Sequence, residues 1–94
     1  MIATFENEDT FSIPDGLEVT PVPDGSMIYQ SSEDRVHYLN PTATIVFELC
    51  GLGKSVAEIE TFLSDGFALL ERPAEQVAAC LVSLTSQGLI VARK

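Results

Sequence analysis

The chain has 94 residues, and we expect one domain and not two, because domains usually contain about 50 to 250 residues. Hydrophobic residues make up 46% of the sequence and charged residues 20%, a composition that predicts a packed core and excludes a disordered chain. The formal net charge of −9 repels the phosphates of nucleic acids and the anionic headgroups of membranes. We therefore expect neither nucleic acid nor membrane as a partner.

Cysteine and histidine, the usual ligands of zinc, are scarce. Two cysteines, Cys50 and Cys80, and a single histidine, His37, are too few for a zinc site, so we expect no metal and no other cofactor. The sequence contains no signal peptide and no run of about 18 apolar residues that could span a bilayer. These features predict a cytoplasmic protein whose thiols are reduced.

Acidic residues dominate the first third of the chain. Eight of them fall within the first 34 positions, where no Lys or Arg precedes Arg35. Residues 1–16 end in the turn sequence Pro14-Asp15-Gly16, and we interpret them as an acidic N-terminal tail, with its docking left open. We expect ordered structure to begin at Leu17 and the domain to cover residues 17–94.

Three short strands are expected next. Residues 17–22 alternate apolar and polar side chains and include prolines, which suit the edge or end of a sheet. Residues 27–30 and 35–39 are rich in β-branched and aromatic side chains, and the polar segment between them has the length of a hairpin loop. Strands this short need a helical layer on one face.

Two helices follow the strands. Asn40 is a good N-cap and Pro41 suits the first helical position, so we expect a helix that ends at Gly51. Ser55 and Glu58 have the spacing of a capping box, which predicts the start of a second helix.

A third helix is expected to open at Pro73 and to close at Gly88, with Leu89 folded back against Leu84 in a Schellman cap. Its apolar side chains recur at helical spacing on one inner face, at Val77, Cys80, Leu81 and Leu84. Short strands beside three helices predict a small α+β domain of winged-helix type.

The sequence Gly51-Leu52-Gly53-Lys54-Ser55 superficially matches a phosphate-binding loop. That motif needs a glycine at the position of Glu48 and a preceding strand, whereas a helix is predicted there. We therefore interpret the segment as a turn between two helices.

No residue pattern indicates catalysis. His37 lies in a predicted strand without an acidic partner that the sequence can place beside it. Cys50 and Cys80 lie on or beside apolar helical stripes, where a free cysteine mostly packs as a small hydrophobe. We expect the protein not to be an enzyme.

The third predicted helix has an unusual outward face, because no charged residue occurs from Gln76 to Gln87. Surface helices normally expose charged side chains. Two interpretations stay open: the helix is buried on a second side, as in a homodimer, or its small side chains form one wall of a groove. The strand at residues 35–39 lacks proline and glycine, so its edge could form the other wall by accepting an added strand.

The junction His37-Tyr38-Leu39-Asn40-Pro41-Thr42-Ala43 resembles that of the PqqD-like family, in which a strand ending in this way runs into the first helix. The resemblance continues at Ser55-Val56-Ala57-Glu58-Ile59 and Gly88-Leu89-Ile90, and covers roughly residues 17–91. Many members of the family carry an acidic residue where this chain has Gln76.

The resemblance implies a non-catalytic recognition element that binds the leader segment of a ribosomally made precursor peptide. The leader would add as a strand to the hairpin and pack against the third helix. The implied partners are that precursor and a modifying enzyme, of a radical or a cyclising, ATP-dependent kind. The peptide-binding residues expected from this mapping are Arg35, Val36, His37, Tyr38, Gln76, Ala79, Cys80 and Ser83.

Two other functions compete with this hypothesis. Winged-helix domains also bind DNA, but a recognition helix without Lys or Arg lacks the usual donors to phosphates and guanines. The second alternative is an accessory subunit that docks on an enzyme through the same neutral helix, with no peptide involved.

Overall fold

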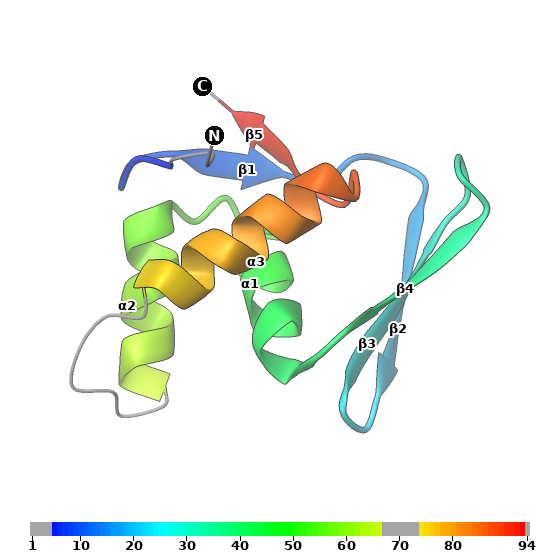
Figure 1. The fold of residues 1–94 in the computed structure, drawn as a ribbon, viewed down its shortest axis with the longest axis horizontal. Coiled ribbons are helices and arrows are strands. Elements are labelled where there is room, and N and C mark those ends of the chain that lie inside the picture. The colour runs from blue at the N-terminus through cyan, green and yellow to red at the C-terminus, as the bar shows by residue number, and fades with distance from the viewer. Residues whose placement is uncertain (1–4, 67–73, 94) are drawn as a thin grey trace.

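The computed structural model describes residues 5–66 and 74–93 (Figure 1). Its elements, in chain order, are β1 (Thr10–Ser12), β2 (Leu17–Val22), β3 (Gly25–Gln30), β4 (Arg35–Leu39), α1 (Pro41–Gly51), α2 (Val56–Gly66), α3 (Ala74–Ser86) and β5 (Val91–Arg93). This is the predicted α+β arrangement of short strands followed by three helices. Pro73, where the third helix was expected to open, lies outside the described residues.

Strands β2, β3 and β4 form an antiparallel sheet in that order, which leaves β4 at one edge. Burial alternates along β3, where Ser26, Ile28 and Gln30 are buried and the residues between them are partly exposed. This alternation gives the sheet one inner and one outer face. All three helices lie on the same side of the sheet in Figure 1, and its other side carries no helix.

A second, two-stranded sheet joins the two ends of the chain. β1 pairs with β5, so that Phe11 lies opposite Ala92. Phe11 is only 1% exposed, and the ring of Phe5 meets it edge to face with 5.4 Å between ring centroids. The expectation that ordered structure begins at Leu17 is therefore wrong: Phe11 has a place in the core, and its strand pairs with residues far away in sequence.

The acidic segment before β1 also satisfies the first turn of α2. The backbone N–H of Val56 donates to the Asp9 carbonyl at 3.0 Å, and that of Ala57 donates to the Asn7 carbonyl at 3.0 Å. The N–H groups at the start of a helix have no partner within the helix. This segment thus has a structural role as well as a solvated acidic surface.

The ends of the helices follow the signals in the sequence. Asn40 Oδ1 accepts from the Ala43 N–H at 2.8 Å, as an N-cap should. Ser55 and Glu58 make both bonds of the capping box, at 2.9 and 3.2 Å. Gly88 has φ +76°, and the Leu89 N–H donates to the Leu84 carbonyl at 2.9 Å, which is the predicted Schellman cap.

The core lies where the inner face of the sheet, the helices and β1 meet. It is apolar throughout and includes one free thiol, that of Cys50. Its buried side chains are Phe11, Ile28, Leu39, Val46, Phe47, Leu49, Cys50, Val56, Ile59, Leu63, Val77, Leu81, Leu84, Leu89 and Ile90.

Candidate functional site

The outer edge of β4 is the first component of the candidate site. β4 pairs with β3 alone, and within residues 5–66 and 74–93 no strand pairs with its other edge. Every second residue of such a strand directs its backbone N–H and C=O groups away from the sheet. Residues 35–39 contain no proline, so the N–H groups that point outward can donate main-chain hydrogen bonds to an added strand.

A stripe of neutral side chains on α3 is the second component. Gln76, Ala79 and Ser83 are exposed and recur every three or four residues, and Gln87 continues the same spacing just after the helix. Cys80 is half-buried between this stripe and the core. Small uncharged side chains let another backbone approach the helix closely.

A groove of about 330 Å³ lies between these two components. Two buried leucines at its base, Leu39 and Leu84, give it an apolar floor. Asn40 and Ala43, at the start of α1, also line it. The complete lining is Tyr38, Leu39, Asn40, Ala43, Ala79, Cys80, Ser83, Leu84 and Gln87.

The structure brings four of the eight sequence-predicted site residues together around this groove: Tyr38, Ala79, Cys80 and Ser83. The other four do not line it. Arg35 and Val36 lie exposed farther along the β4 edge, and Gln76 lies on the first part of the α3 stripe. The side chain of His37 is engaged elsewhere, as described below.

Sequence reasoning missed five lining residues. Gln87 follows Ser83 by one helical turn, so extending the stripe would have found it, and Leu39 and Asn40 directly continue the strand after Tyr38. In the sequence, Ala43 belongs to the start of a helix and Leu84 to the apolar stripe of the third helix, and neither pattern indicates a groove. Their place at the groove depends on how α1 and α3 pack together.

A hydrogen-bonded chain links β4 to the end of α3 through Gln30, which is 7% exposed. The Gln30 side-chain amide donates to the Gln87 carbonyl at 3.3 Å, and its Oε1 lies 2.9 Å from His37 Nε2. Because an amide oxygen can only accept, Nε2 of His37 carries the hydrogen. The close approach requires Gly88, since a Cβ there would lie 3.0 Å from Gln30 Nε2.

This chain of contacts gives His37 a structural role. Its hydrogen-bond partner is an uncharged amide, whereas an orienting carboxylate is the usual partner of a catalytic histidine. The bonds connect β4, through Gln30 of β3, to the residue that follows α3.

The two thiols have different surroundings. Burial raises the pKa of the Cys50 thiol to about 12, and burial also raises the pKa of Cys80. A nucleophilic cysteine needs a lowered pKa, because the thiolate is the reactive form. Neither side chain is therefore an activated nucleophile.

Alkylation should distinguish the two cysteines. With iodoacetamide at pH 8, we expect Cys80 to react in the folded protein and Cys50 to react at least about a hundredfold more slowly, because Cys50 is 0% exposed and burial raises its pKa to about 12. Mass spectrometry of tryptic peptides after timed quenching measures both rates. In urea both cysteines should be alkylated at similar rates, which gives the reference for the unfolded chain. Equal alkylation rates in the native protein would contradict the burial of Cys50.

A second hollow, of about 410 Å³, is lined by residues of α1, of α2 and of the turn between them. Leu49, Lys54, Glu58 and Phe62 are among its lining residues, so it belongs to the surface of α1 and α2. No strand contributes to it, and both signs of charge border it. The groove at β4 is the stronger candidate because, unlike this second hollow, it lies beside an unpaired strand edge.

Other kinds of site find little support in the parts of the chain that the structure describes. No three His, Cys, Asp or Glu side chains in them gather as a metal ion would require. None of the described helices is long and apolar enough to cross a membrane.

Comparisons with known proteins bear on the fold. No model of a known protein family matches the sequence, and no curated protein matches it. The structure is similar to a solved chain described as lasso peptide synthetase B1 complexed with the leader peptide, with a TM-score of 0.74 and 23% sequence identity. The two chains share a fold. The match covers 89% of this chain and 98% of the other.

Proposed function

We propose that this protein is a non-catalytic module that captures the leader segment of a ribosomally made precursor peptide and presents it to a modifying enzyme. The observation that carries the proposal is the free edge of β4 beside the neutral groove of α3. The similar solved chain is described as complexed with the leader peptide, which supports the same ligand class here. The resemblance of residues 37–43 to the junction of the PqqD-like family also supports this ligand class.

Binding proceeds by strand addition. The leader lies extended along β4, and its backbone forms hydrogen bonds with residues 35–38 while alternate side chains enter the groove. Main-chain bonds supply affinity that depends little on sequence, and the shape of the groove supplies selectivity. Micromolar affinity requires a net binding free energy of about −8 kcal/mol, which a short added strand with two or three apolar anchors can reach after ordering costs.

The chemistry of the site supports a binding role in place of a catalytic one. The groove is lined by alanine, serine, leucine and amide side chains, one tyrosine, and one thiol whose pKa is raised. Chemical change in the precursor then belongs to the partner enzyme. The neutral α3 surface also disfavours the DNA-binding alternative, because helix recognition of duplex DNA needs Lys or Arg at phosphates and guanines.

The proposal is tested by titrating the labelled protein with 20-residue synthetic peptides that tile the short reading frames beside its gene. We expect one peptide to bind, with amide shifts concentrated in β4 and α3 and with Cys80 protected from alkylation. Shifts confined to the hollow at α2, or retention of duplex DNA in place of any peptide, would contradict the proposal. Sedimentation of the free protein separates this outcome from a homodimer that buries α3 or β4.

A further inference from the structure

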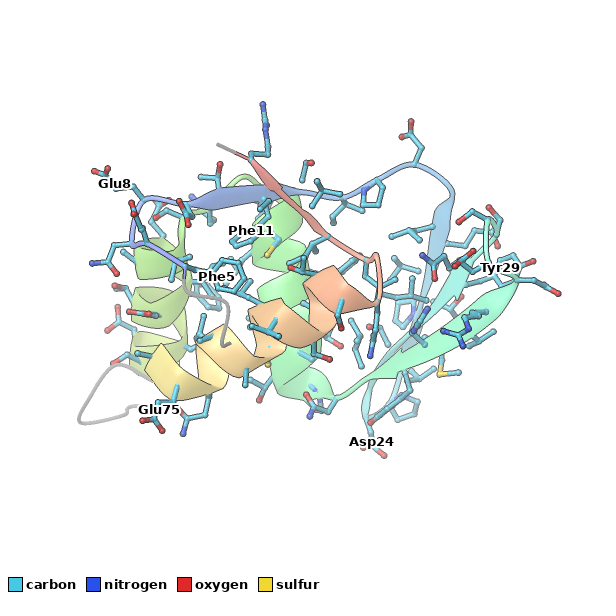
Figure 2. The ribbon with its side chains drawn as sticks, turned by 45° about the horizontal axis from the view of Figure 1, so that its top comes forward. Phe5, Glu8, Phe11, Asp24, Tyr29 and Glu75 are labelled. Carbon is cyan, nitrogen blue, oxygen red and sulfur yellow. The ribbon has the colours of Figure 1, made fainter. Side chains whose placement is uncertain are left out.

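The outer face of the sheet carries an apolar surface beside the edge of β4. Met27 and Tyr29 of β3 alternate with the buried residues of that strand, so their side chains lie on the face away from the helices (Figure 2 labels Tyr29). Val36 and Tyr38 of β4 lie directly opposite them and are 59% and 53% exposed. We call Met27, Tyr29, Val36 and Tyr38 the outer ledge.

Both tyrosine rings of the outer ledge are held in place by their hydroxyl groups. The Tyr38 hydroxyl donates to the Asp24 carbonyl at 2.6 Å, in the turn between β2 and β3. The Tyr29 hydroxyl donates to Asp34 Oδ1 at 2.9 Å, in the turn between β3 and β4. The exposed rings are therefore already ordered, which lowers the entropy lost when another side chain packs on them.

From this arrangement we propose that the outer ledge packs against the outward-facing side chains of the peptide strand that binds at β4 and selects for apolar ones. The inference rests on the proposed function and extends its site to the second face of the sheet. Successive side chains of a strand point to opposite faces, so an added strand places one set in the groove and the other beside Val36 and Tyr38. The expected ligand is a segment with apolar or aromatic residues at consecutive positions.

The geometry selects this occupant. The outer ledge begins at the strand that offers the free edge, and any strand paired with β4 must place alternate side chains next to Val36 and Tyr38. A segment that was polar on its outward face would leave these apolar side chains exposed after binding. If the leader contacted the protein through the groove alone, it would instead need an apolar residue only at every second position.

The test combines one protein variant with an alanine scan of the peptide that binds. Val36→Thr keeps the β-branched shape and strand preference of the side chain but replaces a methyl group with a hydroxyl. We expect a two- to fivefold loss of affinity, the range that a single cross-strand pair supplies. Val19→Thr, at the exposed side chain on the opposite edge strand, is the matched control and should bind as the unmodified protein does.

The peptide scan gives the decisive pattern. We expect alanine substitutions at consecutive peptide positions to weaken binding. In the Val36→Thr protein, the substitutions at the outward-facing peptide positions should no longer weaken it, whereas those at the groove-facing positions still should. If affinity fell only at every second peptide position and Val36→Thr had no effect, the outer ledge would not contact the peptide, and the groove alone would remain as the binding site. A uniform loss in Val36→Thr without coupling to any peptide position would also overturn it. Absence of binding by any tiled peptide would refute the proposed function itself.

Discussion

Ser83→Arg is expected to weaken binding of the leader peptide at least about a hundredfold while leaving the free protein as stable as before. Ser83 is exposed on α3 and lines the groove opposite β4, so an arginine there is solvated until the peptide arrives. Strand addition would then bury the guanidinium against a neutral, partly apolar wall. An unpaired buried charge costs about 3 kcal/mol or more, which corresponds to a hundredfold in affinity.

Calorimetric titration with the peptide measures the affinity, and urea unfolding shows whether the fold is preserved. Ser86→Arg is the matched control, because it makes the same substitution on an exposed position of the same helix that does not line the groove. We expect the affinity of Ser86→Arg to stay within about twofold of the original. The free energies of unfolding of Ser83→Arg and Ser86→Arg should each change by less than about 0.5 kcal/mol. Ala79→Arg should reproduce the loss from the neighbouring turn. Unchanged binding by both Ser83→Arg and Ala79→Arg would place the peptide elsewhere.

Local signals explain why so much of this fold can be predicted from the sequence. Three helix ends are determined by hydrogen bonds that span at most five positions. They lie at Asn40 before Pro41, at the pair Ser55 and Glu58, and at Gly88. The hairpin of β3 and β4 is similarly local, since a four-residue polar turn separates two apolar runs. Such features depend on chain geometry that a reader of the sequence can reconstruct.

The features that escaped prediction depend on contacts between distant parts of the chain. Phe11 lies in an acidic segment with no strong strand pattern, and only its pairing with Ala92 at the other end of the chain explains β1. The same is true of the link from His37 through Gln30 to Gln87, in which two partners lie 57 residues apart. Periodicity along one element cannot reveal a partner on another.

The groove itself was predicted in part for the same reasons. The stripe of Ala79 and Ser83 follows from helical spacing and the absence of charge, and the edge strand follows from the hairpin. Their juxtaposition, and the inclusion of Ala43, depend on the packing of α1 between them. The resemblance to the PqqD-like family supplied that juxtaposition as an implication, which the spacing of residues alone could not.

Gly25→Ala is expected to destabilise the protein by at least about 3 kcal/mol. Gly25 has φ +142°, a conformation that residues with a Cβ rarely adopt. A Cβ at this position would also lie 1.9 Å from the Leu39 carbonyl oxygen and 2.9 Å from the Leu39 carbonyl carbon. Both are backbone atoms, so relief requires β3 and the end of β4 to separate.

Urea unfolding followed by circular dichroism measures this loss, and Gly66→Ala is the control. A Cβ on Gly66, at the end of α2, would meet no atom of the described residues within 4 Å, and we expect its effect on the free energy of unfolding to stay within about 1 kcal/mol. Domains of this size are stable by only about 5 to 15 kcal/mol, so the Gly25→Ala variant loses a large part of its margin. Equal stability of the two variants would contradict the close packing of Gly25 on Leu39.

The same contact connects stability to binding. Leu39 is both the residue that Gly25 touches and part of the groove floor, and Asn40 beside it lines the groove and caps α1. A Gly25→Ala protein that remains folded in the cold must therefore shift the junction between β4 and α1. We expect Gly25→Ala to bind the leader peptide more weakly than the loss of folded protein alone explains. Phe11→Ala, an equally destabilising change far from the groove, is the control and should lower binding only in proportion to the unfolded fraction.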